Sequence, residues 1–517
     1  ASIFASNIGS EHLIGLAGAG ASSGMAMAHW EIQGWMILIL GWVFVPFYTR
    51  SMVYTMPEFL ERRYNPQSRT ILSVISLVSY VLTKVAVTVY AGGLVFQQVF
   101  GIKELWGIDF FWIAAIGLVV LTALYTIFGG MKSVLYTSVL QTPILLLGSL
   151  IILVLGFKEL GGWDEMMRVC GAVTVNDYGD TMTNLIRSND DANFPWLGAL
   201  IGSAIIGFWY WCTDQFIVQR VLSGKNEMEA RRGTIFGAYL KLLPVFLFLI
   251  PGMIAFALHQ KYIGAGGEGF LPMLENGTAN ADAAFPTLVA KLLPAGVKGL
   301  VVCGILAALM SSLASLFNSS AMLFTIDFYK RFRPQTSEKK LVGIGQVATV
   351  VIVILGILWI PIMRSVGDVL YTYLQDVQSV LAPGIAAAFL LGICWKRTSA
   401  QGGMWGLISG MVIGLTRLGA KVYYSNAGEV ADSTFKYLFY DMNWLFFCGW
   451  MFLFCIIVVI VVSLATEAPT AEKIQGLVFG TATKEQKAST RASWNHWDII
   501  HTVIILAITG AFYWYFW

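Results

Sequence analysis

Several ionisable side chains of this sequence lie inside long apolar stretches. A charge at the centre of a bilayer costs about 3 kcal/mol or more, so each such residue is a candidate for binding or transport. Pairing or extension to the interface explains Lys84 and Asp214 equally well. Lys241 is harder to explain in this way, and Glu31 is available to neutralise it across a helical bundle. The candidates are Glu11, His12, Glu31, Lys84, Asp214, Lys241 and Asp376.

A polar, glycine-containing segment at residues 4–12 stands where an apolar helix is expected. A helix that unwinds there frees backbone carbonyl oxygens, which suit a small hard cation such as sodium. A second segment, residues 307–315, has small residues on one helical stripe, including Ser311 and Ser312. Close helix packing also explains the stripe, and an extramembrane loop also explains the first segment. Serine hydroxyls facing the freed carbonyls would complete a sodium site.

The third candidate is the aromatic run Phe-Trp-Tyr-Trp at residues 208–211. Aromatic rings stack on the apolar faces of sugar rings, although aromatic residues at this density more commonly fill a core or an interfacial belt. Gln375 adds an uncharged hydrogen-bonding group in a later apolar stretch. With His12, Glu31 and Lys241 it offers donors and acceptors to an uncharged, polyhydroxylated ligand.

The sequence also excludes several classes of function. It has no phosphate-binding loop, metal-ligand spacing or nucleophile constellation, so ATP hydrolysis and enzyme catalysis have no support. A net charge of +3 gives no reason to expect a nucleic-acid partner. The 517 residues are 57% hydrophobic and only 12% charged, against about 25% charged in soluble domains. With a mean hydropathy of +0.70, this composition predicts a chain embedded in a lipid bilayer.

Membrane-spanning helices must position these residues, because a bilayer core of about 30 Å needs about 20 apolar residues per helix. The sequence thus predicts an all-α integral membrane protein with about 13 transmembrane helices. Spans 70–100 and 296–328 are long enough to tilt or to project from the membrane. The predicted spans are residues 1–24, 29–49, 70–100, 109–128, 137–156, 194–220, 234–259, 296–328, 342–363, 369–395, 403–420, 443–464 and 497–517.

Loop charge predicts the orientation of these spans. The loops on one face carry nearly twice as many Lys and Arg residues as those on the other, whose longest loop, 157–193, is rich in Asp and Glu. The positive-inside rule makes the basic face cytoplasmic and places the C-terminus outside. The aromatic residues at 513–517 suit the membrane interface.

The long spans are the third members of two consecutive groups of five. Because five is odd, the second group must have inverted topology, as in secondary transporters that bind their solute between two repeats. This divides the chain into a first repeat at 1–156, an external loop at 157–193, a second repeat at 194–395 and three accessory helices at 396–517. Since Ala1 already lies in an apolar run, the first helix is expected to be truncated at its start.

Several segments, in the right order and across nearly the whole chain, resemble the sodium/solute symporter family and its sodium/glucose (galactose) cotransporter branch. The resemblance implies a five-plus-five inverted-repeat fold with flanking helices. It also implies sodium-coupled import of a neutral monosaccharide, glucose or galactose, by alternating access. The matching segments are residues 4–12, 54–59, 123–130, 209–215, 239–244, 311–319 and 389–397.

The resemblance also implies the binding residues. Sodium would be held by backbone oxygens and serine hydroxyls, and the sugar by polar and aromatic side chains, with Tyr210 stacking as an inner gate. The implied sodium ligands are Ala5, Ile8, Ala308, Ser311 and Ser312. The implied sugar contacts are Asn7, His12, Glu31, Tyr210, Trp211, Lys241 and Gln375.

The chain departs from the family pattern at several positions. Ser138 stands where an Asp of a second sodium site is common, and Ala314 replaces a frequent Thr beside it, so one sodium per sugar is expected. Gly207 stands where relatives place a polar sugar contact, which leaves the sugar unassigned. The cysteine-bearing external loops of animal members are missing, which favours the plasma membrane of a bacterium, its inner membrane.

Other solutes and another class of protein remain as alternatives. Inositol, an amino acid or sialic acid would each suit a symporter, but a carboxylated solute calls for an Arg that the core spans lack. A sodium-gated sugar sensor or a channel would share the same residues. The sequence assigns no oligomeric state.

Overall fold

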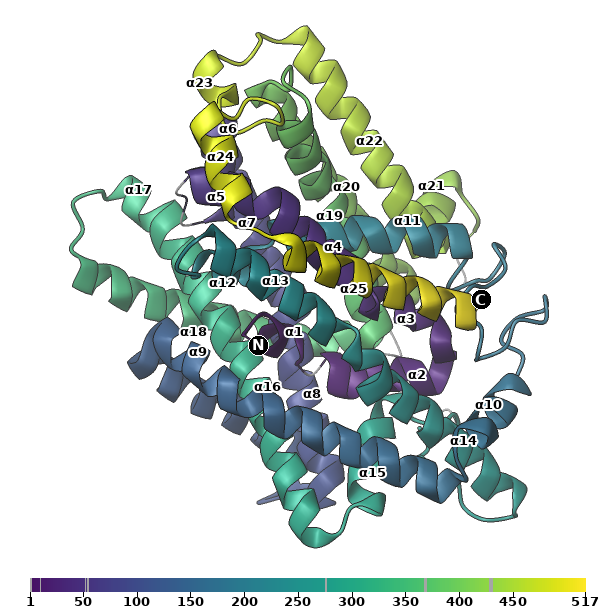
Figure 1. Ribbon diagram of the computed structural model, residues 1–517. Helices are drawn as coiled ribbons and strands as arrows, with labels where there is room; N and C mark the ends of the chain where they lie inside the picture. The colour runs from purple at the N-terminus through teal and green to yellow at the C-terminus, as the bar shows by residue number, and fades with distance from the viewer. Residues whose placement is uncertain are drawn as a thin grey trace.

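The computed structural model of the chain is a bundle of helices (Figure 1). It describes residues 2–9, 11–51, 53, 55–274, 277–366, 370–426 and 431–517. Within its helices, the side chains at 2, 5, 6, 125, 127–142 and 362–366 are outside the description. The one hairpin of the described residues pairs β1 (Glu104–Leu105) with β2 (Ile108–Asp109) in antiparallel fashion.

The first half of the chain begins with several short helical segments and ends with longer helices. They are α1 (Ser2–Asn7), η1 (Glu11–Leu16), α2 (Ala17–Ser23), η2 (Gly24–Met27), α3 (Ala28–Glu31), α4 (Gly34–Ile39), η3 (Leu40–Phe44), α5 (Val45–Ser51), α6 (Met56–Arg63), α7 (Pro66–Ser79), η4 (Tyr80–Val85), α8 (Ala86–Phe100), α9 (Phe110–Leu160) and α10 (Trp163–Gly171).

The second half of the chain contains the remaining helices, including the accessory ones. Its elements up to residue 394 are α11 (Trp196–Gly207), η5 (Phe208–Thr213), α12 (Gln215–Leu222), α13 (Glu227–Lys241), η6 (Val245–Leu249), α14 (Ile250–Gly264), η7 (Ala281–Ala283), α15 (Ala284–Leu292), α16 (Ala295–Met322), η8 (Leu323–Tyr329), α17 (Lys330–Phe332), α18 (Glu338–Val366) and α19 (Leu370–Cys394). The rest are α20 (Ala400–Asn426), α21 (Thr434–Lys436), η9 (Tyr437–Asp441), α22 (Trp444–Ala465), α23 (Ala471–Ile474), α24 (Lys484–Ala492) and α25 (His496–Tyr515).

Membrane residence is supported by helix length and composition. Among the described residues, ten helical segments are long and apolar enough to cross a membrane, so the expected count of 13 is not confirmed. One reason is that the sequence prediction counted interrupted helical runs as separate spans. Residues 1–24 and 29–49 were predicted as two spans, whereas Glu11–Ser51 is a single candidate span in the structure. The predicted span 403–420 lies in α20 but is not among the ten.

Helix α9 replaces two predicted spans, 109–128 and 137–156, with one continuous helix of 51 residues. At 1.5 Å per residue it is about 77 Å long, more than twice the thickness of a bilayer core. The sequence prediction placed a loop around Lys132, but no proline lies near it, and Gly129 and Gly130 are the weakest helix formers there. A glycine in a helix interior costs only about 1 kcal/mol, so these two do not end the helix.

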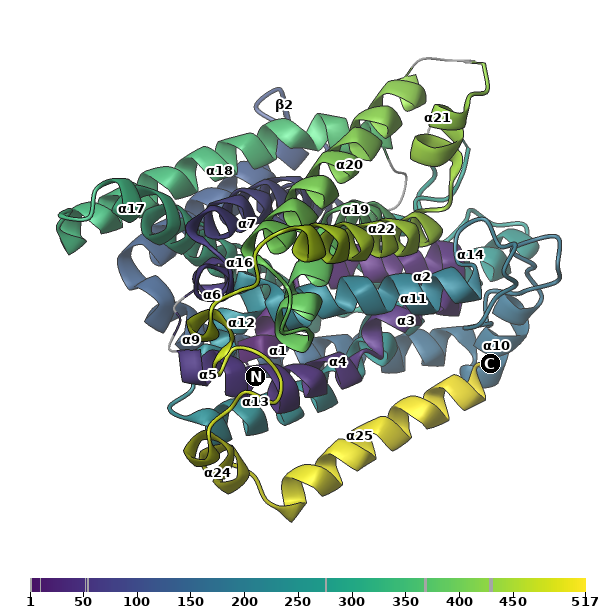
Figure 2. The ribbon, with the colours of Figure 1, turned by 90° about the horizontal axis from the view of Figure 1, so that it is seen from above.

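The accessory helices pack around the two halves. Helices α20 and α22 contact α19, whereas α25 contacts α4 and α13. Figure 2 shows α20 and α25 on opposite sides of the bundle. Helix α25 begins with a capping box at Asn495 and Asp498, and it keeps most of its apolar residues exposed, as a lipid-facing helix does.

Helices α2 and α14 approach each other through glycines. A Cβ atom on Gly252 would lie 1.9 Å from the carbonyl oxygen of Ala17, and one on Gly20 would lie 2.2 Å from that of Leu249. Because both neighbours are backbone atoms, neither rotates away. Small residues thus allow the close backbone contact typical of membrane helices.

We therefore expect Gly252→Ala to lower the stability of the detergent-solubilised protein by about 1–3 kcal/mol, the usual cost of overpacking. Thermal unfolding followed by tryptophan fluorescence would measure the effect. Gly264→Ala in the same helix is the matched control, because no described atom outside its own helical turn lies within 4 Å of its added Cβ. Equal unfolding temperatures for the two variants would contradict the assigned helix contact.

Candidate functional site

The first helix breaks where the sequence predicts an interruption. Helix α1 ends at Asn7, Ile8 and Gly9 are non-helical, and the chain re-enters a helical conformation at Glu11. The amide of Ile8 donates to the carbonyl of Phe4 at 2.8 Å, which closes the last turn of α1. The interruption leaves backbone carbonyls at the end of α1 without the usual helical partners.

Helix α16 contacts α1 and brings the serine pair to this interruption. Ser311, Ser312 and Ala308 are all buried on α16. A Cβ on Gly9 would lie only 2.5 Å from the Ser312 hydroxyl oxygen, so this hydroxyl touches the break itself. The predicted sodium ligands Ile8, Ala308, Ser311 and Ser312 thus lie on two elements in contact; the side chain of Ala5 is outside the described residues, while its backbone belongs to α1.

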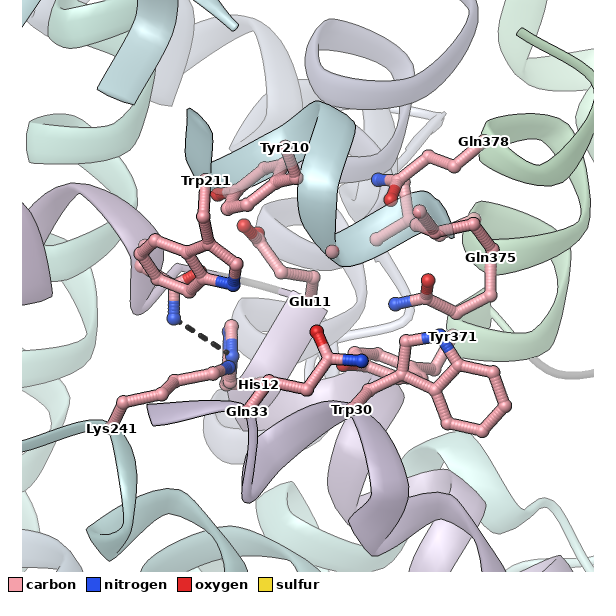
Figure 3. Close-up of a pocket in the computed structure, with 14 residues that line it drawn as sticks. Glu11, His12, Trp30, Gln33, Tyr210, Trp211, Lys241, Tyr371, Gln375 and Gln378 are labelled. Carbon is pink, nitrogen blue, oxygen red and sulfur yellow. Dashed lines mark hydrogen bonds between the residues drawn. The ribbon is translucent and has the colours of Figure 1, made fainter. Parts of the chain in front are cut away.

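A cavity lies beside the break, between the first and second halves of the chain (Figure 3). Its volume is about 40 Å³, room for about three waters at 10–15 Å³ each. A hexose therefore requires the lining side chains to move apart. The lining consists of Asn7, Glu11, His12, Trp30, Gln33, Ile206, Gly207, Tyr210, Trp211, Lys241, Tyr371, Leu374, Gln375 and Gln378.

Glu31 lies behind the cavity wall and organises it. Its carboxylate is fully buried and accepts hydrogen bonds from Lys241 Nζ and from the Tyr371 hydroxyl, each at 2.6 Å. His12 Nε2 lies 3.3 Å from the same carboxylate and also 3.3 Å from Asn7 Nδ2. One carboxylate thus joins η1, α13 and α19. Such a buried pair holds its geometry because separating the charges in an apolar medium is costly.

Three buried polar atoms around the cavity have no hydrogen-bond partner within the described part of the chain. They are His12 Nδ1, Trp30 Nε1 and Gln375 Oε1. Buried polar atoms are nearly always paired, so each needs a partner that the protein does not supply. The indole nitrogen can only donate, whereas the amide oxygen can only accept. A hydroxyl-bearing ligand satisfies both, because each hydroxyl donates and accepts.

Aromatic residues of η5 close one wall of the cavity. The rings of Tyr210 and Trp211 meet edge to face, with centroids 5.1 Å apart. Lys241 Nζ lies 5.4 Å from the centroid of the Trp211 ring, and Lys84 Nζ lies 4.8 Å from the centroid of the Tyr210 ring. Figure 3 shows Gln375 and Gln378 entering from α19, across the cavity from Trp211. The site therefore combines stacking surfaces with facing amide groups.

A short helical segment, made of η7 and α15, packs beside the break. Elements η7 and α15 contact η1, and η7 also contacts α2. Asp282 of η7 is buried and accepts a hydrogen bond from the amide of Leu370, at the start of α19, at 3.2 Å. Its Oδ1 would lie 2.5 Å from a Cβ on Gly18, so η7, α2 and α19 meet at this carboxyl. Burial raises the pKa of Asp282 to about 7.

Comparison with known proteins identifies the family. The model of the sodium:solute symporter family matches residues 1–410, most of the chain. The chain belongs to this family. Sodium is accordingly its co-transported ion, and the chain is a multi-pass, sodium-coupled membrane symporter.

Curated relatives of this symporter carry polyol and sugar names. It is 37% identical to the human sodium/myo-inositol cotransporter 2, over 93% of this chain and 72% of the relative. It is 39% identical to the sheep sodium/glucose cotransporter 1, over 90% of this chain and 72% of the relative. A solved sodium-coupled sialic acid symporter, 21% identical, superimposes with a TM-score of 0.67 over 91% of this chain and 89% of that one. The latter likeness supports the inverted-repeat transporter fold.

The structure brings most of the predicted sugar contacts together. Six of them line the cavity: Asn7, His12, Tyr210, Trp211, Lys241 and Gln375. Glu31 does not line it and acts through its three partners. Two further lining residues, Glu11 and Gly207, were noted in the sequence but not assigned as sugar contacts, and sequence reasoning did not select Trp30, Gln33, Tyr371 and Gln378. Glu11 could be identified in the sequence as a charged residue inside an apolar stretch. No periodic pattern in the sequence distinguishes an uncharged amide such as Gln33 as a binding residue.

The second-sodium position is only partly described. Ala314 is buried on α16, whereas the side chain of Ser138 lies outside the described residues. The prediction of one sodium per solute therefore rests on residue type at these two positions.

Proposed function

We propose that this symporter imports a neutral monosaccharide, glucose or galactose, with one sodium ion per sugar. The observation that supports this most is the set of unpartnered polar atoms, His12 Nδ1, Trp30 Nε1 and Gln375 Oε1, around one cavity. Hydroxyl groups on a ring would complete these hydrogen bonds, and Tyr210 and Trp211 offer stacking surfaces for the ring itself.

Charge in the site favours an uncharged solute. Lys241 is neutralised by Glu31 at 2.6 Å, so its ammonium is not free to bind a carboxylate. None of the cavity-lining residues that the structure describes is an arginine. A carboxylated sugar or an amino acid would therefore enter without the bidentate partner that such a group requires.

A second candidate is myo-inositol, a neutral ring that carries a hydroxyl on every ring carbon. The likeness to the human sodium/myo-inositol cotransporter 2 favours it, and the cavity chemistry accommodates either solute. Sodium held between the α1 break and α16 would fix the first and second halves of the chain in one relative position. The binding of sodium would thereby complete the solute site before the cavity opens to the other side of the membrane.

Uptake into proteoliposomes tests the proposal. The purified protein is expected to accumulate radiolabelled D-glucose or D-galactose when an inward sodium gradient is present, and not with choline in place of sodium. Parallel assays with myo-inositol and with sialic acid rank the alternatives. Sodium-driven uptake of sialic acid alone would overturn the proposal, and solute-independent sodium currents with no uptake would favour a sensor or channel. Protease accessibility of a C-terminal tag in right-side-out and inside-out membrane vesicles would test the predicted external C-terminus.

The proposed sodium site makes a separate prediction. Ser311→Ala and Ser312→Ala should each abolish most sodium-driven uptake while the protein still inserts into the membrane. Losing one hydroxyl ligand to a cation costs about 1.5–3 kcal/mol, so half-maximal uptake should need about ten to a hundred times more sodium. Ser320→Ala is the control, because its buried hydroxyl makes no hydrogen bond within the described residues of α16 and its surroundings. Unchanged sodium dependence in both variants would exclude this site.

Stoichiometry can be read from the limit of accumulation. One sodium crossing 100 mV releases about 2.3 kcal/mol. A tenfold sodium gradient adds about 1.4 kcal/mol, which together support accumulation of a few hundredfold. Vesicles clamped at these values should therefore stop accumulating solute near that ratio. A plateau near the square of this ratio would require two sodium ions and contradict the prediction.

A further inference from the structure

Gly207 lines the cavity at the end of α11, and its backbone does not require glycine. Its φ and ψ are −61° and −41°, ordinary helical values that any residue adopts. A glycine at such a position is less favourable than alanine by about 0.5–1 kcal/mol. The reason for a glycine here must therefore be space rather than conformation.

The space beside Gly207 is filled by the carboxamide of Gln33. A Cβ on Gly207 would lie 2.4 Å from Gln33 Oε1 and 3.0 Å from its Cδ. Gln33 is only 2% exposed, and its Nε2 donates to the carbonyl of Ser203 at 2.8 Å, one helical turn before Gly207. This bond fixes the amide plane against α11. It uses one donor of an amide that has two donors and a double acceptor.

Gln33 also belongs to the cavity wall. Figure 3 shows its side chain between His12 and Trp30, two residues with unpartnered polar atoms. Residues 33 and 207 come from opposite sides, the turn before α4 and the end of α11, and compete for the same volume. A side chain on residue 207 would displace the Gln33 carboxamide from its position.

We propose that Gln33 is a specificity-determining residue, which reads one ring hydroxyl from the position that the missing side chain of Gly207 leaves open. The inference rests on the proposed transport of a neutral polyhydroxylated solute. An amide suits this role because it both donates and accepts without adding a charge. Residues 33 and 207 together then decide from which wall that hydroxyl is recognised.

The test uses Gln33→Leu, which keeps the volume and removes the amide, in proteoliposomes. Its KM for the transported solute should rise by about tenfold, the value of one hydrogen bond in a closed site. A series of deoxy analogues, each without one hydroxyl, should contain one whose KM is the same for both proteins. The sodium concentration for half-maximal uptake should stay unchanged. A KM that rises equally for every analogue, or for none, would overturn the inference.

A second set of variants keeps the test independent of folding. Gly207→Ser should displace the Gln33 amide and raise the KM of the solute, as Gln33→Leu does. The KM of the analogue that lacks the recognised hydroxyl should again stay the same. The double variant Gln33→Ala with Gly207→Asn returns an amide from the other wall and should recover most of the lost affinity; no recovery would count against the shared volume. Gln401→Leu, at an exposed glutamine in α20, is the control for a glutamine lost elsewhere.

The proposed transport function and the proposed role of Gln33 are excluded by different results. If the unmodified protein drives no sodium-dependent uptake of any neutral polyol, the proposed function is wrong, and the role of Gln33 is wrong with it. If the unmodified protein transports such a solute but Gln33→Leu changes the KM of every deoxy analogue equally, or of none, only the role of Gln33 is wrong.

Discussion

Replacement of Lys241 by methionine is expected to abolish sodium-driven uptake and to destabilise the protein by about 3–5 kcal/mol. The variant leaves the fully buried Glu31 carboxylate without its cation, and among the described residues the Tyr371 hydroxyl and His12 are then its polar partners. The loss of a buried partner costs more than the pair contributes, because the remaining charge is desolvated and unbalanced. Thermal unfolding in detergent and uptake in proteoliposomes measure the two effects.

The double variant Glu31→Gln with Lys241→Met separates folding from binding. It removes both charges at similar volume, so stability should return to within about 1–2 kcal/mol of the unmodified protein. Uptake should stay reduced by about ten- to a hundredfold, because Tyr371 and His12 lose the carboxylate that orients them toward the cavity. Recovery of uptake together with stability would show that the pair is needed for folding alone and would contradict a role in the site.

Replacement of Lys84 by methionine should have the second-largest effect. Lys84 Nζ lies 2.5 Å from the Asp214 carboxylate and 3.8 Å from the centroid of the Phe216 ring. Asp214 also accepts from the Tyr80 hydroxyl at 2.8 Å and from the amide of Phe216 at the start of α12. Removing the ammonium leaves this buried carboxylate with neutral donors only, at an expected cost of about 3–5 kcal/mol.

The same variant should alter transport because Lys84 also faces Tyr210. Its ammonium lies 4.8 Å from the ring that forms part of the cavity wall, so its loss frees that ring. We expect faster solute leak in the absence of sodium, measured as efflux from loaded proteoliposomes. Lys436→Met is the control: its partner Asp432 is 95% exposed, and exposed pairs contribute at most about 1 kcal/mol. A leak equal to that of the control would exclude Lys84 as a support for Tyr210.

Some features of the site follow from residue type and local spacing. The polar segment 4–12 cannot continue an apolar helix, and α1 does end at Asn7. Lys241 in a bilayer needs a counter-charge, and Glu31 supplies it at 2.6 Å. Both conclusions depend on the cost of exposing charge or unpaired backbone to lipid, which acts at each residue whatever the fold.

Other features depend on which surfaces meet. Two spans were predicted in the region where α9 runs unbroken. The helix continues because Lys132 and two glycines interrupt it too weakly to outweigh helix propagation. Glu31 was predicted as a sugar contact, yet it lies one layer behind the cavity wall. A sequence pattern gives the side of a helix that is buried but not the depth of a side chain across a bundle.

Composition, span length and family segments were thus enough to determine a sodium-coupled membrane symporter. The tertiary structure alone decided how the cavity is lined, because its walls come from segments that are remote in sequence. Gln33 shows this best: its amide is unremarkable in the sequence and meets Gly207 only after α4 and α11 pack together. Residue type determines which charges and polar groups need a partner inside a membrane. Packing determines which residue is that partner and which polar atoms are left to bind a solute.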